Sequence, residues 1–361
     1  MTSEIGRKIM EYIGEEFFTT DEKEKIPALC QNNPKNVTLL VIRETIAPFI
    51  NRSNSPDESV TFTMPDERRV IHVPARKFKS KEKIFGIKML RYLGMIDSGY
   101  RYNELTLNTQ MRNATSILMG DGVVKKSSEQ KEDGIFVPAR ALYSDVYSIR
   151  DSEYITDKLT NNALNEMGTM YSRETGTTRS SFFFTEFVVP GVFFPALITL
   201  KDPTPELLLH LFVSLRGTAY GASTAITGPN FRNHVIGIVG SRVEPPVTSY
   251  SVSLKHPPDN PSTINFDWLK GMILGDVSSS GTDGMKIVPE ENVKALVDYV
   301  KSLDRQSLME AYRVLNNDIE AFFTYSYPGK KAGSKISKGS KTKENNEPKM
   351  PEGDDSGNIS S

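Results

Sequence analysis

The chain has 361 residues, which allows two domains or one large domain with insertions at roughly 100–200 residues per domain. Lys and Arg number 44 against 45 Asp and Glu, so the net charge of -1 excludes a bulk polycation and any anionic partner must be held by a local patch. The single Cys30 can form neither an intramolecular disulfide nor a structural zinc site alone, which favours a reducing compartment.

No apolar run approaches the roughly 18 residues of a membrane span, and the first residues lack the apolar core and cleavage site of a signal peptide. We therefore expect a cytoplasmic protein with no membrane partner.

The first half of the chain combines one strand signal with long polar stretches. The β-branched run at 37–42 predicts a buried strand, which follows an N-terminal extension over 1–36. The stretches 51–65, 97–137 and 151–181 are much longer than ordinary loops of about 4–6 residues. We expect all three to be insertions that project from the core.

The second half carries more regular patterns. Residues 192–200 predict a strand, and Pro195 places it at a sheet edge or a bulge. Thr204 has the position of a helix N-cap, and the helix should end at Gly217. Residues 235–239 predict a further strand.

Two amphipathic helices are predicted near the end of the chain, at 289–303 and 307–323. The order of strands and helices fits an α+β fold with a ferredoxin-like or RRM-like core over 37–328. Residues 329–361 are poor in apolar side chains and should be a disordered tail.

Common catalytic motifs are missing from the sequence. It contains no GxxxxGK[ST] loop, no GxGxxG, no GxSxG elbow, no HExxH and no CxxC pair. Nucleotide hydrolysis, dinucleotide redox chemistry and the common hydrolase mechanisms therefore lack their usual residues. The four histidines are scattered, and His210 is expected to be an ordinary packing or surface residue.

The strongest positive signal is a basic segment at 68–91, RRVIHVPARKFKSKEKIFGIKMLR, with nine basic residues against the one acid Glu82. A basic face attracts phosphate groups through Coulomb energy and counterion release. Phe78 could stack on an unpaired base, and an extended backbone would send Lys77, Lys79 and Lys81 to one side. The alternative is a solvated, charged loop.

A second polar stretch at 168–184, GTMYSRETGTTRSSFFF, combines hydroxyl groups with Arg173 and Arg179. Hydroxyls and backbone amides could hold phosphate oxygens while the arginines pair with their charge. A hairpin with a plain turn explains the same residues equally well.

Four sequence blocks point to one family: ALYSDVYSIRD at 141–151, then SRETGTTRSS, VPGVFFPALITLKDPT, and GTAYGASTAITGPNFRNHVIGIVGS at 217–241. Together they resemble the major backbone subunit of type I-D CRISPR surveillance complexes, which belongs to the RRM-derived proteins that bind guide RNA. The resemblance is most specific between residues 141 and 241.

The resemblance implies a modified RRM-like palm with inserted subdomains and a thumb hairpin at 151–181. It also implies that copies bind guide RNA without sequence preference and polymerise along it into a helical filament. The filament, together with other type I-D subunits, presents the guide RNA for pairing with target DNA in antiviral defence. The candidate RNA-binding residues are Arg43, Arg76, Lys77, Lys79, Lys81, Arg173, Arg179, Arg232 and His234. No cofactor is expected. Some members of the family that it resembles carry a cysteine-rich, zinc-binding insertion at the region corresponding to 101–122, but this stretch contains no Cys here, so we expect no zinc.

Two other functions are compatible with the sequence. Backbone subunits of related type III complexes cut their target with an Asp in a loop after the first strand, and by position Asp57 matches it, with Glu58 and Asp66 nearby. Such a nuclease would need a divalent metal, Mg²⁺ or Mn²⁺; an ordinary turn Asp is the competing interpretation. The third possibility is a protein-interaction module whose basic face is incidental.

Overall fold

The structure is a computed structural model that describes residues 2–19, 25–27, 33–51, 58–123, 134–162, 171–172, 176–178, 182–221, 228–255, 264–281 and 284–327. All of these belong to one compact unit, Met1–Lys330. The predicted disordered tail at 329–361 lies outside the described residues.

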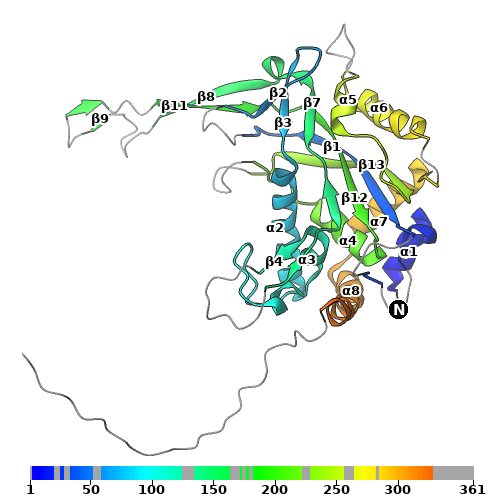
Figure 1. Cartoon of the computed structure of the whole chain (residues 1–361). Helices are drawn as coiled ribbons and strands as arrows, with labels where there is room; N and C mark the ends of the chain where they lie inside the picture. Colours follow the sequence, from blue (N-terminus) through cyan, green and yellow to red (C-terminus); the bar gives the residue numbers. More distant parts are fainter. Residues whose placement is uncertain are drawn as a thin grey trace, which may run out of the picture. The chain divides into compact units, whose positions relative to one another are not determined.

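A five-stranded antiparallel sheet forms the centre of this unit (Figure 1). Its strand order is β14 (Lys286–Ile287), β13 (Phe231–Ser241), β1 (Asn36–Thr45), β12 (Phe193–Lys201) and β6 (Ala141–Tyr143). The strands predicted at 37–42, 192–200 and 235–239 are thus confirmed as β1, β12 and β13.

Pro195 lies on a strand that is interior over only part of its length. It pairs with Ile42 of β1 on one side, whereas β6 pairs only with Ile198–Leu200 on the other side. A proline has no N–H to donate, so it is tolerated where one neighbour is missing. The predicted edge position therefore holds locally, although β12 as a whole lies inside the sheet.

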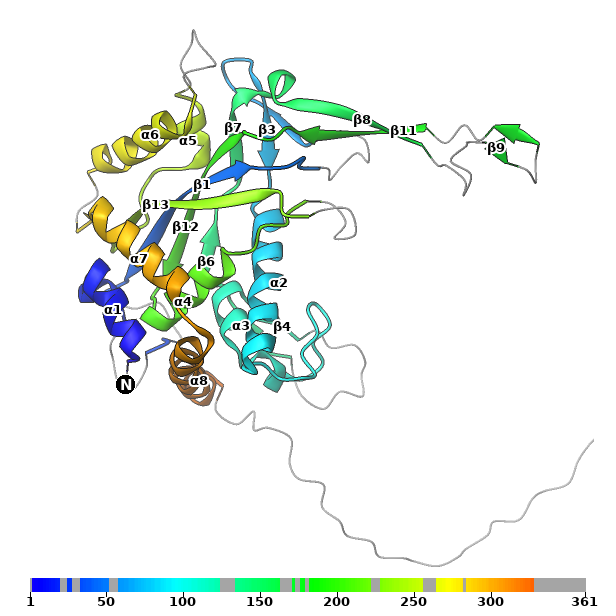
Figure 2. The ribbon, with the colours of Figure 1, turned by 180° about the vertical axis from the view of Figure 1, so that it is seen from behind.

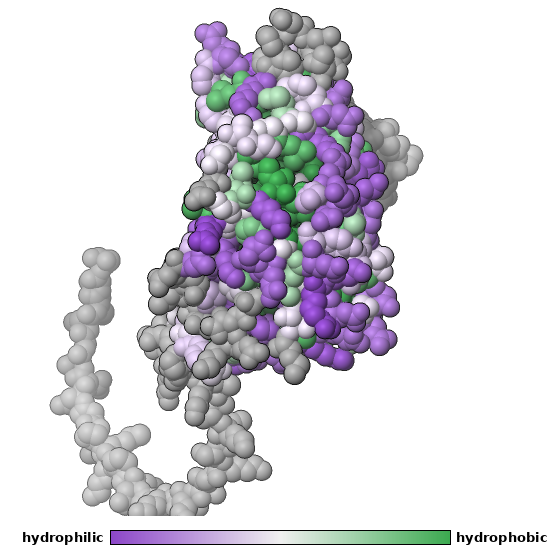
Figure 3. Space-filling model, turned by 90° about the vertical axis from the view of Figure 1, so that its right-hand side faces the viewer, coloured by the Kyte–Doolittle hydropathy of each residue, from purple (hydrophilic) through white to green (hydrophobic). Residues whose placement is uncertain are grey.

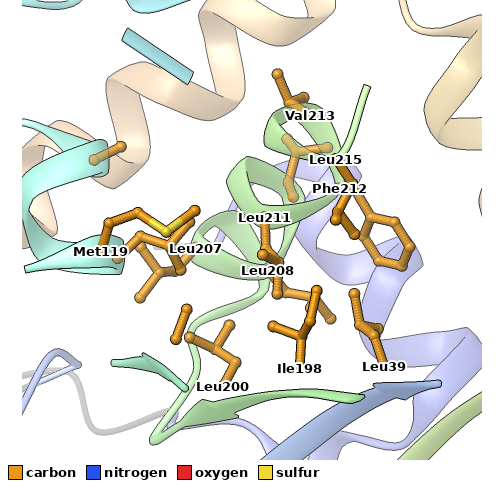
Figure 4. Packing of buried hydrophobic residues seen from close by; sticks show 14 of the residues in the cluster. Leu39, Met119, Ile198, Leu200, Leu207, Leu208, Leu211, Phe212, Val213 and Leu215 are labelled. Carbon is orange, nitrogen blue, oxygen red and sulfur yellow. The ribbon is translucent and has the colours of Figure 1, made fainter. Parts of the chain in front are cut away.

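Helix α4 (Pro205–Ser214) covers one face of the sheet. The side chain of Thr204 accepts a hydrogen bond from the N–H of Leu207, which caps the helix as predicted. Figure 4 shows its leucines above Leu39 of β1 and Ile198 and Leu200 of β12. Around α4 lie α1 (Glu4–Ile13), α2 (Ala75–Leu93), α3 (Ala114–Met119), α7 (Glu290–Ser302) and α8 (Arg305–Ser326).

The other face of the sheet is covered by α5 (Ser249–Ser253) and α6 (Phe266–Ser279), whose buried side chains Val252, Leu269 and Ile273 pack with Leu40 and Ile42 of β1. The sheet therefore lies between two helical layers, and the mixed α+β fold predicted from the sequence is confirmed. The predicted helices at 289–303 and 307–323 are α7 and α8.

Smaller elements lie outside the central sheet, several of them in or next to the long polar stretches. A three-stranded sheet consists of β2 (Thr61–Thr63), β3 (Arg69–Val73) and β7 (Val146–Asp151), and an antiparallel ribbon of β8 (Thr156–Asn162) and β11 (Phe182–Val188) projects beside it (Figures 1 and 2). The remaining pieces are β4 (Asp121–Gly122) with β5 (Phe136–Val137), β9 (Tyr171–Ser172) with β10 (Thr177–Thr178), and the 3-10 turns Glu15–Phe17, Asn108–Met111 and Ser152–Tyr154.

No helix in the described part of the chain is long and apolar enough to cross a membrane.

His210 is a packing residue, as predicted. It is fully buried on α4, where its ring nitrogens lie 2.8 Å from Thr115 Oγ1 of α3 and 2.6 Å from Tyr312 Oη of α8. Burial lowers the pKa of its imidazole to about 3. The neutral ring therefore joins three helices.

This lowered pKa predicts acid-dependent destabilisation. The unfolded chain binds a proton at His210 as the pH falls below about 6.5, while the folded chain does not. Each pH unit below that value should cost up to about 1.4 kcal/mol of unfolding free energy, down to about pH 3. Urea unfolding between pH 7 and 4 measures it, and the His210→Gln variant should have a shallower slope by this amount. If the pH dependence of the unfolding free energy were the same in His210→Gln as in the parent chain, His210 would not be the group responsible.

Candidate nucleic-acid interface

The basic segment folds as β3 followed by the 19-residue helix α2. Residues 76–81 are therefore helical, and the extended backbone considered from the sequence is wrong. Phe78, Gly86, Leu90 and Leu93 recur at spacings of three to eight residues and are all buried. Only a helix brings such spacings to one face, and on this face Gly86 lies against Ser214 and His210 of α4.

Helical geometry regroups the cationic side chains. At about 100° per residue, positions i, i+4 and i+11 share a face, whereas i+2 is turned away. Lys77, Lys81 and Lys88 therefore lie on one side of α2, and we call them the lysine row. Arg76 is exposed in the first turn, and Lys88 is exposed while Lys77 and Lys81 are half-buried.

Lys77 is the most constrained member of the lysine row. Its Nζ donates to Asn51 Oδ1 at 2.9 Å, and burial together with the neighbouring Arg76 lowers its pKa to about 8. Lys77 thus keeps most of its charge at pH 7.

Lys79 lies apart from the lysine row. Its Nζ donates to the carbonyl oxygen of Ala141 at 3.2 Å and lies 5.8 Å from the ring centre of Tyr143. Burial, and then the charge of Lys83, lower its pKa. Its contacts are therefore with β6.

Arg43 is buried, contrary to the solvent-facing position that phosphate binding requires. It is 1% exposed, and its Nη1 lies 2.5 Å from Glu82 Oε1 and 3.0 Å from Asn233 Oδ1. Its guanidinium stacks 4.1 Å from the ring centre of Phe78, which is also buried. We therefore exclude Arg43 from the candidate interface, and Phe78 as a base-stacking surface.

Glu82 is the acceptor at the centre of this buried network. Besides Arg43 it accepts hydrogen bonds from Tyr143 Oη at 2.5 Å and Tyr220 Oη at 2.9 Å. The network joins α2 to β1, β6 and β13, which fixes the lysine row relative to the central sheet.

The segment after α4 also packs on α2. A Cβ added to Gly217 would lie 3.1 Å from the Cβ of Phe85, so the absence of a side chain permits this close approach. Tyr220 then exchanges two hydrogen bonds with Asn230, from its N–H to Oδ1 and from Nδ2 to its carbonyl oxygen, both at 2.9 Å. These residues hold the segment beside the helix.

Arg232 and His234 lie on the other face of the sheet. Both contact Glu44 Oε2, at 3.3 and 2.8 Å, and the His234 ring packs edge-to-face on Phe266 of α6. Strand alternation places Asn233, the partner of Arg43, on the α2 side and its two neighbours on the α6 side. The described sequence-predicted residues therefore do not form one patch: Arg232 and His234 are on the opposite side of the sheet from α2.

Three of the predicted site residues, Asp57, Arg173 and Arg179, lie outside the described residues. Of the neighbours of Asp57, Glu58 is exposed and Asp66 pairs with Arg68 at 2.7 Å. Among the residues that the structure describes, no group of three or more His, Cys, Asp or Glu side chains could hold a metal ion.

The sequence reasoning missed Lys88, Glu82, Tyr220 and Asn230. The spacing of Phe78, Gly86, Leu90 and Leu93 was a signal for the helix, and with it for the place of Lys88 in the lysine row. The other three partners come from distant segments, and no local pattern predicts such a network.

The class that these observations define is an α+β protein with an RRM-like antiparallel sheet and a lysine row on a helix beside it. The family model described as Csc2 CRISPR matches residues 123–253. The crystal structure of Thermofilum pendens Csc2 has a TM-score of 0.56 and 12% identity, over 89% of this chain and 98% of that one. This chain therefore shares the fold of Csc2.

Two further solved structures are similar at lower scores. A chain of a CRISPR RNA-guided surveillance complex has a TM-score of 0.41 and 11% identity, over 80% of this chain and 100% of that one. A chain of a type IV-B CRISPR complex has a TM-score of 0.39 and 11% identity, over 55% and 89%. No curated protein matches the sequence.

Proposed function

We propose that this chain is a guide-RNA-binding backbone subunit of a type I-D CRISPR surveillance complex. The observation that carries the proposal is the lysine row on α2, in a chain of net charge -1 with the fold of Csc2. The family match over residues 123–253 supports the assignment to a CRISPR complex.

In this function the protein binds RNA without sequence specificity. The lysine row and Arg76 pair with phosphates, which look alike at every nucleotide. Copies bind side by side along one guide RNA and leave its bases free to pair with target DNA, so that base pairing supplies specificity. The projecting β8–β11 ribbon is the candidate thumb that separates one bound segment from the next.

The proposed function requires no cofactor and no zinc. The partners of the protein are the guide RNA, the target DNA, further copies of the chain and other subunits of the complex. The role of the protein is structural, so substrate cleavage is not part of it. Incubation of the guide-loaded protein with single-stranded target and Mg²⁺ or Mn²⁺ tests that point. An evenly spaced product ladder that disappears in Asp57→Ala would replace this proposal by the nuclease alternative.

The direct test is fluorescence anisotropy of the purified chain with mixed-sequence single-stranded RNAs of increasing length, across a salt series. We expect binding that is salt-sensitive, the same for unrelated sequences, and saturated by more copies on longer RNA. A matched DNA series shows whether the sugar matters. Absence of binding at low salt would contradict the proposal and favour the interaction module.

A further inference from the structure

A groove runs along the outer edge of β13. It has a volume of about 370 Å³, and its floor is the strand itself, from Asn233 to Ile236. One wall is α6, with Phe266 and Lys270, and the other is α7, with Val293 and Val297. Because α6 and α7 cover opposite faces of the sheet, the groove opens between the two helical layers.

The edge of β13 inside this groove is unpaired among the described residues. The N–H of Phe231 bonds to Thr218, and β14 pairs only with Val239 and Gly240, after which the N–H of Val288 bonds to Ile238. Residues 232–237 lie between these contacts. They span about 20 Å of strand at roughly 3.3 Å per residue.

The chain itself shows that this edge accepts an antiparallel strand. β14 occupies it over two residues and then turns away into α7. Unpaired sheet edges are normally blunted by a charge, a proline or a covering element. Within the described part of the chain no strand covers residues 232–237 of this edge, and α6 and α7 flank it.

The walls of the groove favour a peptide over a polyanion. Phe266, Val293 and Val297 supply apolar surface, and Figure 3 shows an apolar area within a mostly hydrophilic surface on the side where α6 and α7 lie. Its charges are mixed, because Lys270 pairs with Glu290 and Lys301 lies 3.9 Å from Asp298. Three lysines face two carboxylates here, so the charges nearly balance and offer a polyanion little net attraction.

Lys294 supplies the remaining charge. It is exposed, lines the groove, and has no ion pair with the residues that the structure describes. A bound strand with one carboxylate facing α7 would complement it.

We propose that this groove is a strand-addition site for an extended segment of a different protein, with apolar side chains at alternate positions and one carboxylate toward Lys294. Main-chain hydrogen bonds to residues 232–237 supply affinity, and the apolar walls supply selectivity. The site is independent of the lysine row, which lies on α2, so it does not depend on the proposed RNA binding.

The test uses the full chain and a library of random dodecapeptides displayed on phage. The selected peptide is synthesised with a fluorescent label, its affinity is measured by anisotropy, and amide hydrogen exchange is followed with and without it. We expect slower exchange at residues 232–237, and selected sequences with alternating apolar residues and an acid. Val297→Arg, which fills the groove, should weaken binding by about tenfold or more.

Ala295→Arg is the matched control, because Ala295 is exposed on the same helix but does not line the groove; its affinity should stay within about twofold. Lys294→Glu, at an exposed position that does not risk the fold, should weaken binding by about fivefold. The proposal is overturned if no peptide protects residues 232–237. It is also overturned if Val297→Arg abolishes self-association or RNA binding instead, because the groove would then hold a second copy or RNA.

Discussion

Replacing Lys77, Lys81 and Lys88 together by Gln should lower the affinity for single-stranded RNA about a hundredfold at 0.1 M salt. Each phosphate contact contributes about 0.7 to the logarithmic salt dependence for single strands, so three contacts contribute about two powers of ten at that concentration. The slope of log K against log salt should become shallower by about two. The loss should be equal for unrelated RNA sequences, because phosphates carry no sequence information.

The control is the triple variant Lys255→Gln, Lys286→Gln and Lys301→Gln. It removes the same total charge from three lysines that are about half to two-thirds exposed and lie away from α2. Its affinity and its salt slope should stay close to those of the parent chain. Equal losses in both triple variants would mean that net charge, not the lysine row, governs binding. Unchanged affinity in the α2 variant would remove this helix from the interface.

Glu82→Ala should be among the most destabilising single substitutions in the chain. Glu82 is fully buried and accepts hydrogen bonds from Arg43, Tyr143 and Tyr220. Its removal leaves the guanidinium of Arg43 buried without a counter-charge, which costs about 3–5 kcal/mol. That is a large share of a domain's usual 5–15 kcal/mol. Urea unfolding followed by circular dichroism measures the change.

Glu320→Ala provides the comparison for the same chemical change. Glu320 pairs with Arg112, but its side chain is 54% exposed. An exposed pair contributes less than about 1 kcal/mol, so this variant should unfold close to the parent. The double variant Arg43→Met with Glu82→Leu should be less destabilised than the sum of its single changes, because no charge is left unpaired. Additive losses would show that Arg43 and Glu82 are not coupled.

Local patterns were sufficient for the elements whose sequence signal is continuous. The β-branched run at 37–42 predicts β1 because each of these side chains is buried in an interior strand. Thr204, Pro205 and the leucines that follow predict α4 because capping, backbone angle and apolar spacing all agree. The same holds for α7 and α8.

The basic segment shows where a charge count is insufficient. Nine cations in 24 residues indicate a basic surface, but the direction of each side chain depends on the backbone. In the helix, Lys79 turns toward β6 and Lys88 joins Lys77 and Lys81. Lys77, Lys79 and Lys81 are closest together in the sequence, but the lysines that share a face of the helix are Lys77, Lys81 and Lys88.

Arg43 illustrates the same limit in the interior. An Arg within a strand of apolar residues is compatible with a binding role or with an internal ion pair, and only Glu82, 39 residues further along the chain, distinguishes them. Composition, strand and helix patterns, and the basic character of α2 follow from the sequence because they depend on neighbours along the chain. The Arg43–Glu82 network, the separation of Arg232 and His234 from α2, and the groove beside β13 depend on contacts between distant segments, which only folding brings together.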